Sequence, residues 1–351
     1  MNFGRDTKTI LLGFPAKPWL LQPRSRTCLT LGETQAQQRR AMLWLLETGV
    51  RQMKPLLLGL ALAAFVAIPP TLAAPPDGYV KVWGDEFDEP NLDAGKWYTR
   101  YVYNGGTLDH LNDEQERYRD AGTHVMTGHS VQLTALPKGA DGLYPSGMLR
   151  SREAFDLNAG IYIEARLKMP AGLGTWDGFW LAPMENADGS GPAWPPEIDI
   201  MEIVNNGRDD TTSMYNTSAK VGNWKVGNHQ VGYGAQGLAS TFTVKDFNSR
   251  FNAWYSSIDF SKGFHTIGFW YDAGAYTIFV DGKKIYAAKY KWVDDAGNPS
   301  PRANIQLDLA VGGHWAGRYG IDDNAFPQAL EAEYVRVFQK DASPPSSVGV
   351  H

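Results

Sequence analysis

Three carboxylic acids lie within six residues of an otherwise apolar segment, Glu197-Ile-Asp-Ile-Met-Glu202. Side chains alternate between the two faces of a β-strand, so Glu197 and Asp199 share a face. Regular alternation would send Glu202 to the other face, and a β-bulge of one extra residue would bring it back beside them. Like charges on one sheet face push one carboxyl pKa up and leave another carboxyl ionised. A protonated acid beside an anionic nucleophile is what glycoside hydrolysis requires.

Two simpler explanations of the acid triplet compete with catalysis. Acidic residues that alternate with Ile are the ordinary signal of a strand with one solvent-exposed face. Dense carboxylates also bind hard cations such as Ca²⁺, although neighbouring strand residues make a poor cage without loop carbonyls. Trp194-Pro-Pro196 directly before the triplet favours a functional site over an ordinary exposed strand.

Further segments flank the triplet in a definite order. Tyr144–Ser151, Ala159–Gly172 and Gly174–Pro183 precede it, and Gly263–Thr266, Phe279–Gly282, Leu309–Trp315 and Tyr334–Phe338 follow it. This order and spacing resemble glycoside hydrolase family 16, the group of laminarinases, lichenases, agarases and carrageenases, from about Val82 to Gln339. The ExDxxE spacing resembles the laminarinase-like branch, which carries the bulge.

The resemblance implies an all-β fold, a two-sheet β-jelly-roll sandwich of the concanavalin or lectin type with a concave substrate groove. It also implies catalysis with retention of configuration, in which Glu197 is the nucleophile and Glu202 the acid/base. Asp199 lies between these two glutamates and would hold hydrogen bonds of the nucleophile and help to keep Glu202 protonated.

Sugar binding needs flat apolar surfaces for C–H groups and polar groups for hydroxyls. Four tryptophans lie in or beside the family-like segments: Trp176, Trp180, Trp194 and Trp315. The resemblance adds Asn112, Glu114 and Arg150, at positions that contact sugar or support the site in the family. Laminarinase-like relatives usually carry a His on the strand after the acids, where this chain has Thr211–Thr217 without His, and Asn216 is expected to substitute for it.

Short apolar or alternating runs separated by Gly, Pro, Asn and Asp predict an all-β sandwich or barrel from Val80 onward. Asp281-Gly282 predicts the turn of a hairpin between Tyr276–Val280 and Lys284–Ala288. Residues 205–258 are polar and Gly-rich, and we expect one or two strands and a long loop there. No long amphipathic helix is predicted.

The N-terminal part predicts a processed leader. Residues 56–68 are an apolar run of signal-peptide length between Met53-Lys54 and small residues at 71–74. We therefore divide the chain into a doubtful extension (1–52), a signal peptide (53–74), a catalytic domain resembling family 16 (75–340) and a flexible tail (341–351). A secreted protein, extracellular or periplasmic, is expected.

Charge and cysteine content argue against several classes of partner and of metal site. The chain has 33 Lys+Arg and 38 Asp+Glu, and residues 1–74 hold nine of the basic and three of the acidic residues. The predicted mature part therefore has 24 basic and 35 acidic residues, a net charge of −11. This balance argues against nucleic acid and anionic membrane surfaces as partners. The single Cys28 lies in the leader, which leaves the mature chain without a disulfide or thiolate metal site.

These observations predict a secreted, monomeric endo-β-glycanase that cleaves internal bonds of β-1,3- or β-1,3/1,4-glucan and needs no cofactor. Alternatives are a depolymerase of a bacterial exopolysaccharide such as succinoglycan, a galactanase, a transglycosylase, or a non-catalytic lectin-like binding protein. A catalytic metal is not expected. A structural Ca²⁺ would use Glu86 and Glu333, although paired surface acids without this role are the simpler expectation.

Overall fold

In the described part of the chain, the regular structure is almost entirely antiparallel β-strand, as the alternating sequence pattern predicts. The computed structural model describes residues 75–101, 108–183, 195–206, 224–228, 239–245, 247–248, 253–254, 256, 258–294, 296–300 and 302–341. The predicted extension, the predicted signal peptide and all but the first residue of the predicted tail lie outside these ranges.

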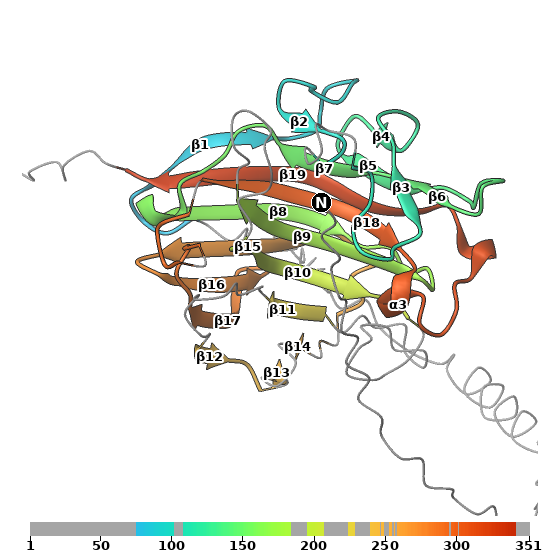
Figure 1. Cartoon of the computed structure of the whole chain (residues 1–351). Helices are drawn as coiled ribbons and strands as arrows, with labels where there is room; N and C mark the ends of the chain where they lie inside the picture. The colour runs from blue at the N-terminus through green and yellow to red at the C-terminus, as the bar shows by residue number, and fades with distance from the viewer. Residues whose placement is uncertain are drawn as a thin grey trace, which may run out of the picture. The chain divides into compact units, whose positions relative to one another are not determined.

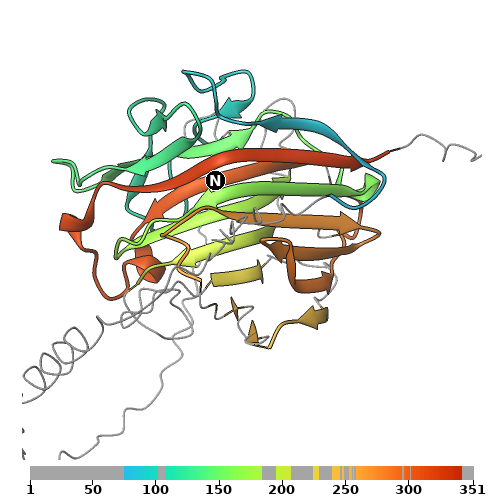
Figure 2. The same ribbon diagram turned by 180° about the vertical axis from the view of Figure 1, so that it is seen from behind.

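Two large sheets make up the described part of the chain (Figure 1). The first runs in the order β12-β17-β16-β15-β8-β19-β5-β4, with β1 also paired to β19. Its strands are β1 (Tyr79–Asp85), β4 (His124–Met126), β5 (Val131–Ala135), β8 (Ile161–Lys168), β12 (Ala239–Thr243), β15 (His265–Asp272), β16 (Ala275–Val280), β17 (Lys283–Lys289) and β19 (Gln328–Lys340). The view from behind shows β19, β8 and β15 side by side (Figure 2).

The second sheet carries the acid triplet and runs in the order β13-β14-β11-β10-β9-β18-β7-β2. Its strands are β2 (Trp97–Tyr98), β7 (Met148–Ser151), β9 (Thr175–Pro183), β10 (Ile198–Val204), β11 (Trp224–Asn228), β13 (Phe247–Asn248), β14 (Ala253–Trp254) and β18 (Ala303–Val311). A short parallel pair, β3 (Glu116–Tyr118) and β6 (Tyr144–Ser146), stands apart from both sheets.

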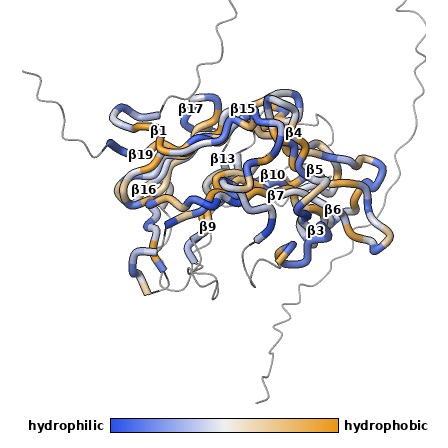
Figure 3. Tube along the Cα trace, turned by 90° about the horizontal axis from the view of Figure 1, so that it is seen from above, coloured by the Kyte–Doolittle hydropathy of each residue, from blue (hydrophilic) through white to orange (hydrophobic). Residues whose placement is uncertain are grey.

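The core lies between the two large sheets. Alternate residues of β8, among them Ile163 and Leu167, join one buried cluster with Phe179 of β9 and Leu307 of β18. Polar and apolar stretches accordingly interleave along the strands (Figure 3). Because one face of each sheet is apolar and buried against the other, the predicted sandwich is confirmed.

The predicted hairpin is also confirmed. Strands β16 and β17 pair antiparallel up to Val280 opposite Lys283, with Asp281 and Gly282 at the turn. These two residues have φ of 47° and 76°, the left-handed backbone that a two-residue type I′ turn needs at both positions.

Residues 205–258 differ from the prediction of one or two strands. Their described parts contain four strand segments, β11 to β14, two of which are only two residues long. Such short strands extend the edge of an existing sheet, and their sequence lacks the long alternating run by which a strand is usually recognised.

Helical structure is minor in the described part of the chain, in accord with the sequence. It consists of α3 (Gly313–Ala316) and the 3₁₀ turns η1 (Leu157–Ala159) and η2 (Asp323–Ala325). None of the helices among these residues is long and apolar enough to cross a membrane.

Candidate active site

The acid triplet lies at a β-bulge, as predicted. Strand β10 pairs with β9 so that Asp199 is opposite Trp180 and Glu202 opposite Gly178, and the register shifts between Asp199 and Met201. The extra residue lets Ile200 and Met201 both enter the buried core. Glu202 thereby returns to the face of Asp199, which confirms the predicted bulge.

A cavity of about 280 Å³ opens on this face of the second sheet. All three acids of the triplet line it, and Asp199 and Glu202 are more than nine-tenths buried there. Two further acids, five aromatic residues and four others complete the lining: Glu114 and Asp308; Tyr101, Tyr118, Trp176, Trp180 and Trp315; Leu111, Asn112, Gly178 and Ala310.

Strand register explains how distant segments reach the same cavity. Glu202 lies opposite Gly178 of β9, and Gly178 lies opposite Asp308 of β18. Gly178 has no side chain, and a Cβ there would stand 2.9 Å from Asp308 Oδ1. The glycine therefore leaves open the space above the sheet between these two acids.

Most of the predicted sugar-binding residues gather at this cavity. Trp176 and Trp315 meet edge to face with their ring centroids 4.7 Å apart, and both line it. Asn112 Nδ2 donates to Glu114 Oε1 over 3.2 Å on another wall. Flat aromatic surfaces can bind the C–H faces of a sugar ring, and amide and carboxyl groups beside them can bind its hydroxyls.

Arg150 is placed differently from the other predicted residues. It lies on β7 opposite Gln306 of β18, is almost fully buried, and is not part of the cavity lining. Its Nη2 donates to the Pro183 carbonyl oxygen and to Asn304 Oδ1, at 3.2 and 3.0 Å. Arg150 thus supports the strands under the site. Trp194 and Asn216 lie outside the described residues.

Several residues of the site were not predicted from the sequence. Asp308 accepts hydrogen bonds from Trp180 Nε1 at 2.6 Å and from the Tyr118 hydroxyl at 3.1 Å. The ring of Tyr101 meets that of Tyr118 edge to face, with centroids 5.6 Å apart. The available signal was an acid within the otherwise apolar run Leu307-Asp-Leu309-Ala-Val311, which places one charge in the middle of a buried strand.

Tyr290 is another residue that was not predicted from the sequence, and it lies on the core side of the acid triplet. It is buried, and its hydroxyl accepts a hydrogen bond from the backbone N–H of Glu197. Burial raises the pKa of this phenol, so it stays neutral. The residue before β10 is therefore tied through its backbone to the segment that follows β17 of the first sheet.

Two acids of the cavity wall have strongly raised pKa values. Burial raises the pKa of Glu114 to about 7 in spite of the hydrogen bond from Asn112. Burial also raises the pKa of Asp308 to about 7, and the charge of Glu202 adds to this effect. Displaced carboxyl pKa values beside ionised carboxyls are typical of acid–base sites.

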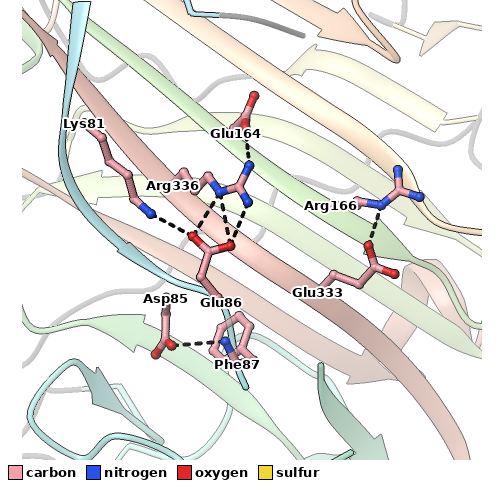
Figure 4. Close-up of polar contacts among 8 residues, drawn as sticks. All are labelled: Lys81, Asp85, Glu86, Phe87, Glu164, Arg166, Glu333 and Arg336. Atoms are coloured by element: carbon pink, nitrogen blue, oxygen red, sulfur yellow. Dashed lines mark hydrogen bonds and ion pairs between the residues drawn. The ribbon is translucent and has the colours of Figure 1, made fainter. Parts of the chain in front are cut away.

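The residues suggested for a structural Ca²⁺ are engaged with arginines (Figure 4). Glu86 accepts from Arg336 Nη2 and Lys81 Nζ, both at 2.7 Å, and these cations lower its pKa to about 2. Glu333 pairs separately with Arg166. In the described part of the chain no group of three or more His, Cys, Asp or Glu is arranged to hold a metal ion. The calcium site stays a prediction.

Enzymes of β-glycan hydrolysis are among the known proteins with similar sequences. A β-glucanase of Rhodothermus marinus is 28% identical over 74% of this chain and 84% of its own length. A glucan endo-1,3-β-glucosidase of Niallia circulans and a keratan-sulfate endo-1,4-β-galactosidase of Sphingobacterium multivorum are each 25% identical over 74% of this chain. The matches cover 38% and 55% of those two proteins.

Solved structures share the fold. The laminarinase from Rhodothermus marinus superposes with a TM-score of 0.53 at 24% identity, covering 74% of this chain and 97% of the laminarinase. The endo-β-1,3-glucanase from Pyrococcus furiosus gives a TM-score of 0.51 at 22% identity, covering 74% and 94%.

The family model for glycosyl hydrolases family 16 matches residues 112–326, more than half of the chain. This range includes the bulged strand, the cavity-lining tryptophans and Asp308. The chain belongs to glycosyl hydrolase family 16.

Proposed function

We propose that this glycoside hydrolase is a secreted endo-β-glucanase that cleaves internal bonds of β-1,3- or β-1,3/1,4-glucan with retention of configuration. The observation that carries the proposal is the bulge, which gathers Glu197, Asp199 and Glu202 in one cavity. The relatives named β-glucanase and endo-1,3-β-glucosidase support the substrate class.

The proposed reaction has two steps. Glu202 donates its proton to the glycosidic oxygen while the Glu197 carboxylate attacks the anomeric carbon, which breaks the C–O bond and forms a covalent glycosyl–enzyme. Glu202 then takes a proton from water, whose oxygen attacks the anomeric carbon and releases Glu197. Two inversions give net retention. Asp199, between the glutamates, orients them and accepts hydrogen bonds in the cavity.

The walls of the cavity support a neutral polysaccharide as substrate. Five of its described lining residues are acids, and none is Lys, Arg or His. Such a surface repels sulfate and carboxylate groups, while Trp176, Trp180 and Trp315 offer apolar faces to sugar rings. A neutral glucan satisfies both conditions.

A galactan or a bacterial exopolysaccharide is the second candidate substrate. The similarity to an endo-1,4-β-galactosidase and the lack of His between Thr211 and Thr217 favour it. A lectin-like protein without catalysis is disfavoured by the intact triplet. Secretion rests on the apolar run 56–68, and N-terminal sequencing of exported protein that starts near Ala74 would support it.

The proposed function is tested by two assays of the purified protein. New reducing ends are measured on laminarin, mixed-linkage β-glucan, agarose and succinoglycan, and we expect the highest rate on a β-glucan. Proton NMR of a fresh digest should show the β-anomer first. If the α-anomer appears first, the reaction inverts and the roles of Glu197 and Glu202 must be abandoned. Binding without new reducing ends would favour the lectin-like alternative.

A further inference from the structure

Two loops form one wall of the cavity. The loop before β3 contributes Leu111, Asn112 and Glu114, and the loop after β18 contributes Trp315 on α3. Trp315 also packs edge to face on Trp176, and together they form the aromatic surface of this wall. The contacts between the two loops therefore determine where Trp315 lies relative to Asn112 and Glu114.

Buried hydrogen bonds join the two loops where they leave the strands. The backbone N–H of Gln115 donates to the carbonyl oxygen of Val311 at 2.7 Å, and the backbone N–H of Val311 donates to Glu116 Oε2 at 2.8 Å. Glu116 and Val311 are fully buried. These two bonds fix where each loop begins, but neither involves α3.

Asp113 joins the two loops at α3 itself. Its Oδ2 accepts a hydrogen bond from the backbone N–H of His314 at 2.9 Å, across 201 positions of the chain. His314 lies in the first turn of α3, where backbone N–H groups have no partner within the helix. Gly312, the residue before the helix, provides no side-chain cap. Asp113 thus caps α3 from the opposite loop.

Two glycines make this close approach possible. Gly312 and Gly313 have φ of 80° and 62°, in the left-handed region that favours glycine. A Cβ at Gly313 would stand 2.9 Å from Asp113 Oδ1, and one at Gly312 would stand 3.0 Å from Gln115 Cδ. Any larger residue at these positions would push the loop of Trp315 away from the loop of Asp113.

We propose that Asp113 is a positioning residue for sugar binding, which holds Trp315 on α3 at a fixed distance from Asn112 and Glu114. The inference rests on the proposed function, because it takes the cavity as the site of a glucan. Asp113 is not part of the cavity lining, and its side chain is 62% exposed, so it acts through the two loops. Binding groups that are already fixed relative to one another lose less entropy when a ligand contacts them together.

The test compares KM and kcat of the wild type and Asp113→Ala on the polysaccharide that the wild type cleaves fastest. Ala removes the acceptor of the His314 N–H but leaves the buried bonds at the loop bases, so the variant should fold. We expect KM to rise about five- to tenfold while kcat stays within about twofold, because the lost interaction serves the ground state and the transition state equally. Asp113→Asn keeps an acceptor oxygen and should recover most of the loss.

A double-mutant cycle shows whether Asp113 acts through Trp315. Trp315→Ala should itself raise KM, because it removes an aromatic surface of the wall. If Asp113 acts by placing this ring, adding Asp113→Ala to Trp315→Ala should raise KM by less than about twofold. A general loosening of the domain would instead raise KM by the same factor in both backgrounds.

Asp141→Ala is the matched control. Asp141 is also an exposed acid whose Oδ1 accepts a backbone N–H, that of Leu143, at 3.1 Å. It too lies against a glycine, since a Cβ at Gly139 would stand 2.8 Å from Asp141 Oδ1. Asp141 has no contact with the cavity wall, so KM and kcat of this variant should equal those of the wild type.

Gly313→Ala is a second route to the same test if Asp113→Ala does not fold. It retains the carboxyl of Asp113 but places a methyl group against its Oδ1, so KM should rise while kcat is kept. A folded Asp113→Ala or Gly313→Ala enzyme with an unchanged KM overturns the inference. So does an Asp113→Asn enzyme no better than Asp113→Ala, or an equal factor in both arms of the cycle. A wild type without hydrolysis of any polysaccharide overturns the proposed function instead.

Discussion

At the scale of single residues, the different tasks that we propose for the three acids agree with their positions. Glu197 precedes β10 and is less buried than Asp199 and Glu202, which lie within the strand. Its backbone is anchored from the core side by Tyr290. A nucleophile needs an ionised carboxylate with a fixed backbone, whereas a proton donor benefits from burial.

Replacing Glu197 tests the nucleophile. Glu197→Gln keeps the size and the polarity of the side chain but cannot attack the anomeric carbon. We expect turnover of a β-glucan to fall by at least about a thousandfold. Calorimetric titration with an oligosaccharide should still detect binding, because Trp176 and Trp315 are intact. A folded variant with near-normal turnover would remove Glu197 from the mechanism.

The acid/base and the central acid are separated by chemical rescue. Glu202→Ala removes the proton donor but leaves Glu197 able to attack an aryl glycoside with a good leaving group. Azide should then restore product formation, because it replaces the activated water in the second step. Asp199→Asn should retain more activity and show no response to azide. The reverse pattern would mean that the roles of Asp199 and Glu202 are exchanged.

At the scale of elements, the bulge in β10 brings Glu202 to the cavity face, where a regular strand of the same sequence would not place it. It places two consecutive apolar residues, Ile200 and Met201, opposite the single residue Phe179. Since the side-chain period of a strand is two residues, one extra residue on β10 decides which face Glu202 occupies.

Deletions in β10 test this account of the bulge. Removing Ile200 leaves Met201 alone opposite Phe179, so Glu202 should still face the cavity. We expect a folded, partly active enzyme that is less stable by about 2–5 kcal/mol through the loss of one buried Ile side chain. Removing Ile200 and Met201 together should turn Glu202 toward the core and abolish activity. Thermal melts measure the stability of the two variants and glucan assays measure their activity. Equal inactivity of both deletions would contradict this account of the bulge.

Local sequence pattern predicted the elements more completely than the contacts between them. The bulge and the Asp281-Gly282 turn follow from spacings of a few residues. The bonds of Asp308 to Tyr118 and Trp180 join residues 190 and 128 positions apart. No spacing within one segment reveals such pairs, because the order of strands in the sheet creates them.

At the scale of the whole molecule, the domain keeps several acids away from water. Asp177 is fully buried, and neither of its carboxyl oxygens has a hydrogen-bond partner on another residue among those that the structure describes. Burial raises the pKa of Glu116 as well, and one of its oxygens is likewise unpartnered. A buried acid without partners is far cheaper to keep protonated than ionised. Glu86 is the opposite case, with a pKa lowered to about 2 by Arg336 and Lys81.

These shifts determine how stability depends on pH. A carboxyl whose pKa is raised in the folded state, such as Asp177, adds no pH dependence to the free energy of unfolding below about pH 3.9, because it is protonated in both the folded and the unfolded state there. Above that pH the unfolded chain releases the proton and the folded domain retains it, so stability falls as pH rises. Glu86 acts in reverse, because its contribution is lost as pH falls from about 4.5 toward 2.

The asparagine variant of Asp177 isolates this effect. Asp177→Asn imitates the protonated acid at every pH. The free energy of unfolding of the variant should therefore equal that of the wild type near pH 4 and exceed it increasingly toward pH 8. The difference should grow by about 1.4 kcal/mol per pH unit until the folded carboxyl itself ionises. Denaturant unfolding of both proteins between pH 4 and 8 measures it. A constant difference across this range would mean that Asp177 does not retain its proton in the folded domain, and that water or a cation reaches it inside the core.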